Sequence, residues 1–292
     1  NDTATTEIYH SFPISLTRVP QAILPDPRTL VKEMGRDLMK GRDLAWRLAV
    51  RDISAQYRAS FLSYLWAFIT PLVTTLMWVF MSMAGVVKVA VTDMPYPVFV
   101  FTGTMLWQIL TEAITAPQNQ VTASQSMVVK LNFPREALIM AGILKVLFSV
   151  LVKTAILVPV VLLFGITPDV HLLLFPLALL ALVVVGTSIG LLLVPVGTLY
   201  TDVGRIVPMA TQFLMYLTPV VYALPKSGTM ATLLQLNPLT SLIVTGRAWL
   251  TGSASLMVPQ FLLVLGAAVV MLVLGWVLFR LAMTVLVERM GS

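Results

Sequence analysis

Long apolar stretches separated by short polar segments dominate the chain. Six of them reach the length of about 20 residues that an α-helix needs to cross the hydrocarbon core of a bilayer. They cover residues 61–87, 96–116, 138–164, 172–199, 206–223 and 257–283. The pattern predicts an all-α integral membrane protein with six transmembrane helices, a membrane domain over residues 59–283 and a C-terminal tail over residues 284–292.

Residues 224–255 are apolar in places but are broken by prolines and glycines. Irregular backbone persists at membrane depth only where protein or a water-filled cavity satisfies its polar groups. The segment therefore predicts two short re-entrant helices between the fifth and sixth spans, which enter from one side and meet at Asn237 and Pro238.

The residues before the first span divide into a polar extension over 1–25 and an amphipathic region over 26–58. Asp26 and Pro27 are typical of a helix start, and Gly41 allows a break. One face of this region is apolar and the other carries charges, so we expect interface helices that lie in the plane of the membrane surface. They would anchor the chain there, form a ledge for a cytoplasmic partner, or do both.

Composition and charge support a membrane protein. Charged residues make up 11% of the chain, whereas soluble domains carry about 25%. The net charge is +6, and nine of the 19 Lys and Arg residues precede the first span, where anionic headgroups attract each basic residue by about 1 kcal/mol. No nucleic-acid-binding module accompanies it, so no nucleic acid is expected as a partner. The remaining Lys and Arg residues favour loops on the same side, which predicts that both termini are cytoplasmic.

The sequence holds no convincing catalytic or metal site. It lacks cysteine, and its two histidines are far apart, so no metal ligand set is expected. Residues 186–190 match the G-x-S-x-G pattern, but they lie inside an apolar span without a nearby histidine, which indicates close helix packing instead. No lysine follows a glycine, so a P-loop is absent and the chain itself is expected to bind no ATP and no other cofactor.

Three ionisable residues, Glu112, Lys145 and Lys153, fall inside predicted spans, where charges are costly and are candidates for functional sites. The two lysines could form a cationic stripe facing an anionic cargo. Alternatively, Lys145 snorkels to the surface and Lys153 pairs with Glu112. Aromatic residues near the span ends form an interfacial belt or line a path for sugars; the candidates for such a path are Trp66, Trp107, Tyr216 and Tyr222.

Six short patterns follow one another along the chain in a fixed order. They are Arg51-Asp52-Ile53 with Tyr57-Arg58 and Leu65-Trp66-Ala67; Tyr96-Pro97-Val98-Phe99; Asn132-Phe133-Pro134-Arg135-Glu136; Tyr200-Thr201-Asp202-Val203; Thr218-Pro219-Val220-Val221-Tyr222; and Asn237-Pro238. In this order they resemble the permease subunits of ABC-2-type exporters of O-antigen, capsular polysaccharide and teichoic acid. The chain departs from that family at Leu62-Ser63, where a glycine is common, and in its longer N-terminal extension.

The resemblance implies a homodimer in the bacterial inner membrane that binds two copies of a separate ATPase, which would hold ATP and Mg²⁺, and that exports a lipid-linked glycan. It also implies a role for several groups of residues. These are an ATPase-coupling loop (Lys130, Asn132, Phe133, Pro134, Arg135, Glu136), a surface for the lipid pyrophosphate (Arg47, Arg51, Arg58) and an outer gate (Asn237, Pro238). An ABC-2 exporter of a drug or small lipid and an ATP-independent flippase are the alternatives; the absence of an internal repeat disfavours the flippase.

Overall fold

The computed structural model describes residues 27–58, 63–86, 94–125, 135–166, 169–200, 202–225 and 227–291. All regular structure in these ranges is helical, as predicted. The elements are α1 (Pro27–Arg58), α2 (Ser63–Met83), α3 (Tyr96–Ala123), α5 (Glu136–Leu163), the 3₁₀ helix η2 (Val170–Leu174), α6 (Phe175–Leu199), α7 (Val203–Tyr216), α8 (Thr229–Leu236), α9 (Pro238–Leu250) and α10 (Val258–Gly291).

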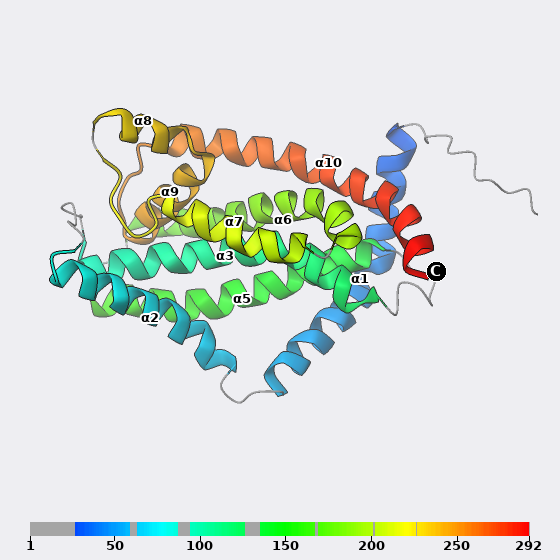
Figure 1. The fold of residues 1–292 in the computed structure, drawn as a ribbon, viewed down its shortest axis with the longest axis horizontal. Coiled ribbons are helices and arrows are strands. Elements are labelled where there is room, and N and C mark those ends of the chain that lie inside the picture. The colour runs from blue at the N-terminus through cyan, green and yellow to red at the C-terminus, as the bar shows by residue number, and fades with distance from the viewer. Residues whose placement is uncertain are drawn as a thin grey trace, which may run out of the picture.

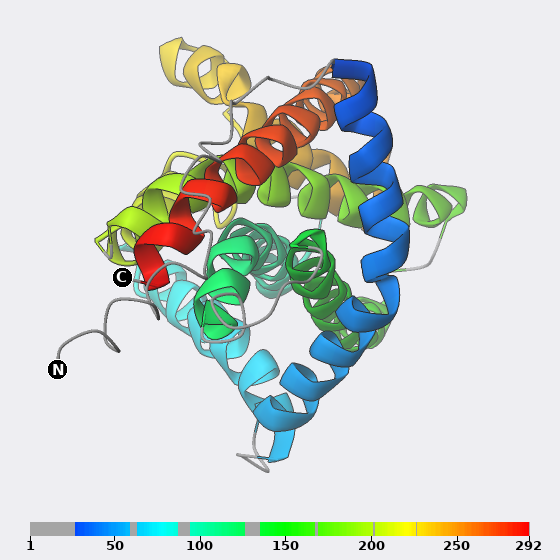
Figure 2. The same cartoon turned by 90° about the vertical axis from the view of Figure 1, so that its right-hand side faces the viewer.

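The long helices run along one axis of the molecule, and α1 lies across one end of them (Figures 1 and 2). The two short helices α8 and α9 lie at the opposite end. We call these the α1 end and the α9 end. Helix α3 occupies the centre and packs against α6 on one side and α5 on another, while α10 packs against α6.

Glycines on α6 permit its close approach to α3. A Cβ added at Gly190 would lie 2.3 Å from the carbonyl oxygen of Ile114, and one at Gly186 would lie 2.5 Å from the Cβ of Ala113. Residues 186–190 therefore form a packing face between helices, as predicted, and Ser188 of this segment is buried and donates to the carbonyl of Val185.

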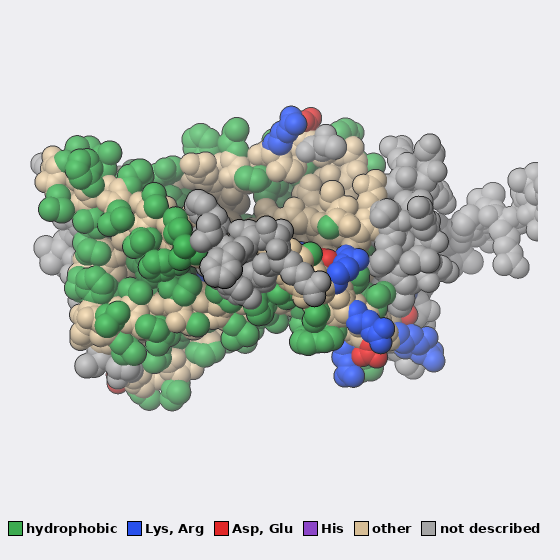
Figure 3. Space-filling view, turned by 90° about the horizontal axis from the view of Figure 1, so that it is seen from below, with side chains coloured by type: hydrophobic (Ala, Val, Ile, Leu, Met, Phe, Trp, Pro, Cys, Tyr) green, Lys and Arg blue, Asp and Glu red, His purple; other side chains and the backbone are tan. Residues whose placement is uncertain are grey.

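Four helical segments in the described part are long and apolar enough to cross a membrane: Tyr96–Ala123, Glu136–Leu163, Val170–Leu199 and Val258–Met283. In Figure 3 hydrophobic side chains are densest on the part of the face away from the α1 end, while most of the visible charged side chains gather toward the α1 end. Such an apolar exterior requires lipid or a protein partner as its surroundings.

Two of the predicted spans do not meet these criteria of helix length and apolar character. In α2 the apolar stretch among described residues is Phe68–Met83. The prediction of one helix over 206–223 is wrong, because α7 ends at Tyr216 and has 14 residues, a length of about 21 Å. Residues 217–219 form a turn instead, and Pro219, which lacks the N–H that a helix uses, lies within it. The count of six spans stays a prediction.

Two short helices do occupy residues 224–255, and they meet at Asn237 and Pro238 as predicted. Asn237 caps α9, since its side-chain oxygen accepts from the backbone N–H of Leu239 at 3.0 Å. That these helices re-enter the membrane stays a prediction.

Helix α1 begins at Pro27 and continues through Gly41 without a break. At Gly41 the missing side chain allows close contact with α5 instead, because an added Cβ would lie 3.2 Å from the Cβ of Ala137. Ala45, Leu48 and Ala49 extend this buried face. Residues 1–25 and the coupling residues Lys130, Asn132, Phe133 and Pro134 lie outside the described residues.

Candidate functional site

Helix α3 carries a row of polar side chains through the otherwise apolar bundle. Their spacing of three or four residues places them on one helical face, which extends for about 22 Å from first to last. We call this row the polar face of α3; it consists of Thr104, Gln108, Thr111, Glu112, Thr115 and Asn119. Of these residues only Glu112 had been singled out from the sequence, although the spacing itself was a signal for the others.

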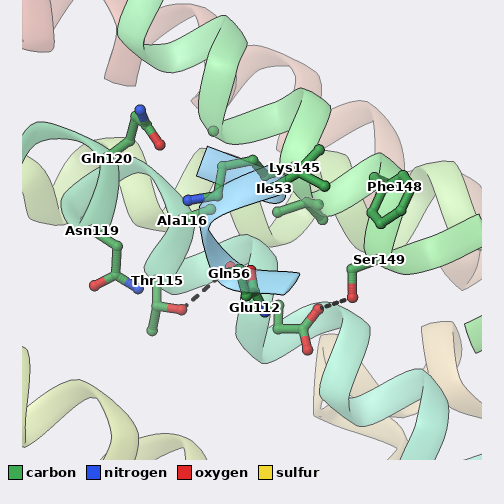
Figure 4. A pocket seen from close by; sticks show the side chains of 12 residues that line it. Ile53, Gln56, Glu112, Thr115, Ala116, Asn119, Gln120, Lys145, Phe148 and Ser149 are labelled. Atoms are coloured by element: carbon green, nitrogen blue, oxygen red, sulfur yellow. Dashed lines mark hydrogen bonds between the residues drawn. The ribbon is translucent and has the colours of Figure 1, made fainter. Parts of the chain in front are cut away.

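One cavity lies beside the polar face toward the α1 end, among α1, α3 and α5. Its volume is about 280 Å³. Its polar lining includes Gln56 of α1, Asn119 and Gln120 of α3, and Lys145 and Ser149 of α5 (Figure 4). We call it the α1-side cavity.

A second hollow, of about 360 Å³, lies among α2, α3 and α7. We call it the α7-side groove. Its lining is Thr74, Thr104, Trp107, Gln108, Thr111, Glu112, Thr115, Pro208, Thr211, Gln212 and Met215. Glu112 and Thr115 line both hollows, so the polar face of α3 connects them.

Glu112 is held in place from α5. The side chains of Glu112 and Ser149 point toward one another (Figure 4), with the Ser149 hydroxyl donating to Glu112 at 2.6 Å. The Lys153 ammonium group donates to the other oxygen of Glu112 and, at 2.8 Å, to Ser149. The Lys153 side chain is 2% exposed and that of Glu112 is 42% exposed. Of the two alternatives for these charges, the structure therefore bears out the pairing of Lys153 with Glu112.

Lys145 also faces a carboxylate. Its ammonium group lies 3.7 Å from Asp52 of α1, which accepts hydrogen bonds from Gln120 at 3.0 Å and Arg51 at 2.8 Å. Burial by itself raises the pKa of Asp52, but these hydrogen bonds and the charges of Lys145 and Arg51 outweigh it and hold the pKa below its ordinary value. The carboxylate of Asp52 thus stays ionised and joins α1 to α3 and α5.

A second polar contact, which the sequence analysis missed, lies at the α9 end. Arg247 of α9 is 4% exposed, and its guanidinium donates to the carbonyls of Val220 at 2.6 Å and Pro219 at 3.3 Å. The same group lies 3.6 Å from the centroid of the Phe99 ring, a cation–π geometry. An added Cβ at Gly103 would lie 2.1 Å from the Val220 carbonyl oxygen, so this glycine makes room for the turn after α7.

The predicted gate residue Asn237 binds the same turn. Its side-chain nitrogen donates to the carbonyl of Leu217 at 2.9 Å and to the hydroxyl of Thr218 at 3.0 Å. Tyr222 donates to the carbonyl of Tyr216 at 2.9 Å. These contacts make residues 217–223 a fixed connection between α7, α8 and α9. Neither Tyr216 nor Tyr222 is among the residues that line the two hollows.

Among the other predicted residues, Trp107 is 5% exposed and lines the α7-side groove. Arg47 is exposed on α1, and Arg51 is bonded to Asp52. The side chains of Arg58 and Trp66 lie outside the described side chains.

At the start of α5, Arg135 is partly buried and Glu136 is 4% exposed. The carboxylate of Glu136 accepts from Arg280 of α10 at 2.8 Å, and Arg280 also lies 3.0 Å from Asp37 of α1. This arginine therefore joins α10 to α1 and to the start of α5.

Comparison with known sequences identifies the family of the chain. The profile of the family described as ABC-2 type transporter matches residues 43–250. The chain belongs to this family. The ABC-2 match begins in α1 and includes the polar face of α3, both hollows and the Arg247 contact.

Two relatives of this ABC-2 chain bear the same name, O-antigen export system permease protein RfbA. The protein from Myxococcus xanthus is 24% identical over 216 residues, which cover 73% of this chain and 82% of that protein. The protein from Klebsiella pneumoniae is 24% identical over 209 residues, which cover 70% and 79% respectively.

Proposed function

We propose that the chain is the channel-forming subunit of an ATP-driven exporter that moves a lipid-linked polysaccharide across the bacterial inner membrane. The observation that carries this proposal is the polar face of α3, which connects two hollows within an apolar bundle. A hydrated chain of sugars needs hydrogen-bonding groups along its path, because each unpaired polar group in an apolar medium is costly. The family match and the names of the two relatives favour a polysaccharide as cargo.

In this proposal both termini are cytoplasmic, the α1 end faces the cytoplasm, and α8 and α9 re-enter from the outside as the outer gate. Helix α1 supports a place at the membrane surface for the α1 end, since it presents the exposed apolar residues Met39, Trp46 and Val50 beside exposed charges. Such a helix suits the headgroup region of a bilayer. Arg47, Arg51 and Arg58 would attract the pyrophosphate of the lipid carrier there.

The energy for transport would come from a separate ATPase, which binds ATP and Mg²⁺ and joins the assembly in two copies with two copies of this chain. The segment 130–136 would receive its motion. Within that segment Arg135 is available to contact the ATPase, whereas Glu136 is buried against Arg280 and would fix the start of α5. ATP-driven closure of the ATPase pair would then shift α5 relative to α3 and widen the path.

The test is purification of the tagged full chain from its native membranes in a mild detergent, with mass spectrometry of bound proteins. We expect a P-loop ATPase in equal amount. Arg135→Glu should lower the amount retained, while Arg135→Lys, which keeps the charge, should not. A chain that is stable yet always purifies alone would overturn the proposal in favour of an autonomous flippase.

A further inference from the structure

The polar side chains that line the α7-side groove are almost all uncharged. Most of them are threonines and glutamines, and they lie beside the apolar side chains of Trp107, Pro208 and Met215. The only charged side chain among the described residues that line it is Glu112. Thr111 and Thr115 donate their hydroxyl protons to carbonyls of α3 and are partly exposed, so their hydroxyls offer acceptor positions to a ligand. The amides of Gln108 and Gln212 offer both donors and acceptors.

The two lysines on α5 beside the polar face of α3, Lys145 and Lys153, each face a carboxylate. Lys153 is 2% exposed and lies behind Glu112, with its protons directed at Glu112 and Ser149. Lys145 lines the α1-side cavity rather than the groove and faces Asp52. A ligand that enters the groove thus meets the exposed part of the Glu112 carboxylate, and meets neither ammonium group.

We infer that the α7-side groove is a binding subsite for uncharged sugar units and disfavours glycans that carry uronate or phosphate groups. This inference rests on the proposed function and adds the charge class of the cargo. Neutral sugars present hydroxyls that pair with the threonines, the amides and Glu112, whose ionised oxygens accept strong hydrogen bonds. An anionic sugar would face a like charge in a partly enclosed site, where such pairs are strongly unfavourable.

The experiment is saturation-transfer NMR on the full chain in phosphatidylcholine nanodiscs at pH 7. This method detects weak binding. The probes are maltohexaose, which is uncharged, and a hexamer of galacturonate of the same length. We expect saturation of maltohexaose protons and a signal at least about tenfold weaker for the uronate, which corresponds to about 1.4 kcal/mol.

Three variants test whether charge in the groove sets this preference. Thr111→Lys places a cation in the groove and should raise the uronate signal several-fold. Thr122→Lys is the matched control, because Thr122 is exposed on the same helix outside both hollows, and it should leave the preference unchanged. The double variant Glu112→Gln with Lys153→Met removes both charges together and should reduce the preference to less than about threefold, which tests the inference even where Thr111→Lys fails to fold.

Equal or stronger saturation of the uronate by the wild type would overturn the inference. An absence of saturation for both hexamers would also overturn it, by removing the groove as a sugar subsite. Neither result would affect the exporter proposal, which is judged by the ATPase that purifies with the chain.

Discussion

Replacing either member of the Glu112–Lys153 pair removes the same ion pair, yet we expect the two replacements to differ in cost. Glu112→Gln leaves the Lys153 ammonium group without its counter-charge at a position that is 2% exposed. Breaking a buried pair in this way costs about 3–5 kcal/mol. Ser149 would remain as a hydrogen-bond partner for the ammonium group, but a neutral hydroxyl does not replace the lost charge.

Lys153→Met should cost less. Methionine is apolar and similar in length, so it fills the buried space without a new polar group. Glu112 is 42% exposed and keeps the hydroxyl of Ser149, so its carboxylate stays solvated from the groove. The cost is then that of one partly exposed charged hydrogen bond, about 1–2 kcal/mol. The double variant should lose less free energy of unfolding than the two single variants lose together. In the double variant both charges are absent, so neither is left without its partner.

The free energy of unfolding of the purified full chain, measured by titration of dodecyl sulfate into mixed micelles, provides the comparison. We expect Glu112→Gln to be less stable than Lys153→Met by about 2 kcal/mol. A result in which Lys153→Met is equally or more destabilised would refute the assignment of Lys153 as the buried member and Glu112 as the member facing the groove.

The same titration tests the close packing of α6. Gly186→Ala should lower stability by about 1–3 kcal/mol, since its Cβ would lie 2.5 Å from that of Ala113, whereas Gly266→Ala, with nothing within 4 Å, should be neutral or stabilising. Arg247→Met leaves two carbonyls without their donor and should cost about 1–3 kcal/mol and speed proteolysis between α7 and α8; unchanged cleavage would count against the contact. Because the pKa of Asp52 is lowered, its stabilising contribution is present above about pH 4 and is lost as pH falls through the lowered pKa. The melting temperature of Asp52→Asn should therefore depend less on pH between about 5 and 3 than that of the wild type, and equal slopes would contradict this.

How far the sequence determines this fold is clearest from α7. The apolar character of residues 206–223 is real, but hydropathy averages over a window and ignores the backbone. Proline lacks the N–H that a helix requires, but α7 continues through Pro208, so Pro219 alone did not mark where the helix ends. The two short helices at Asn237 and Pro238 were predictable because several prolines and glycines interrupt the apolar residues there.

The candidate site was also predictable only in part from the sequence. Opposite charges in apolar spans made the pairing of Glu112 with Lys153 one of two clear alternatives, and the choice needed the positions of α3 and α5. Arg247 had no predicted role. Its partners are main-chain carbonyls and an aromatic ring, and residue types alone do not mark which carbonyls lie near an arginine. The polar face of α3 could have been recognised from its spacing.

The double attachment of Arg280 has a mechanical consequence. Its guanidinium donates to Glu136 at the start of α5 and lies 3.0 Å from Asp37 on α1. One side chain therefore links three helices that are distant in sequence. A force applied at the start of α5 would be divided among all three. The interface helix and the last helix would then be displaced along with α5, and a local push would become a concerted tilt of one wall of the bundle.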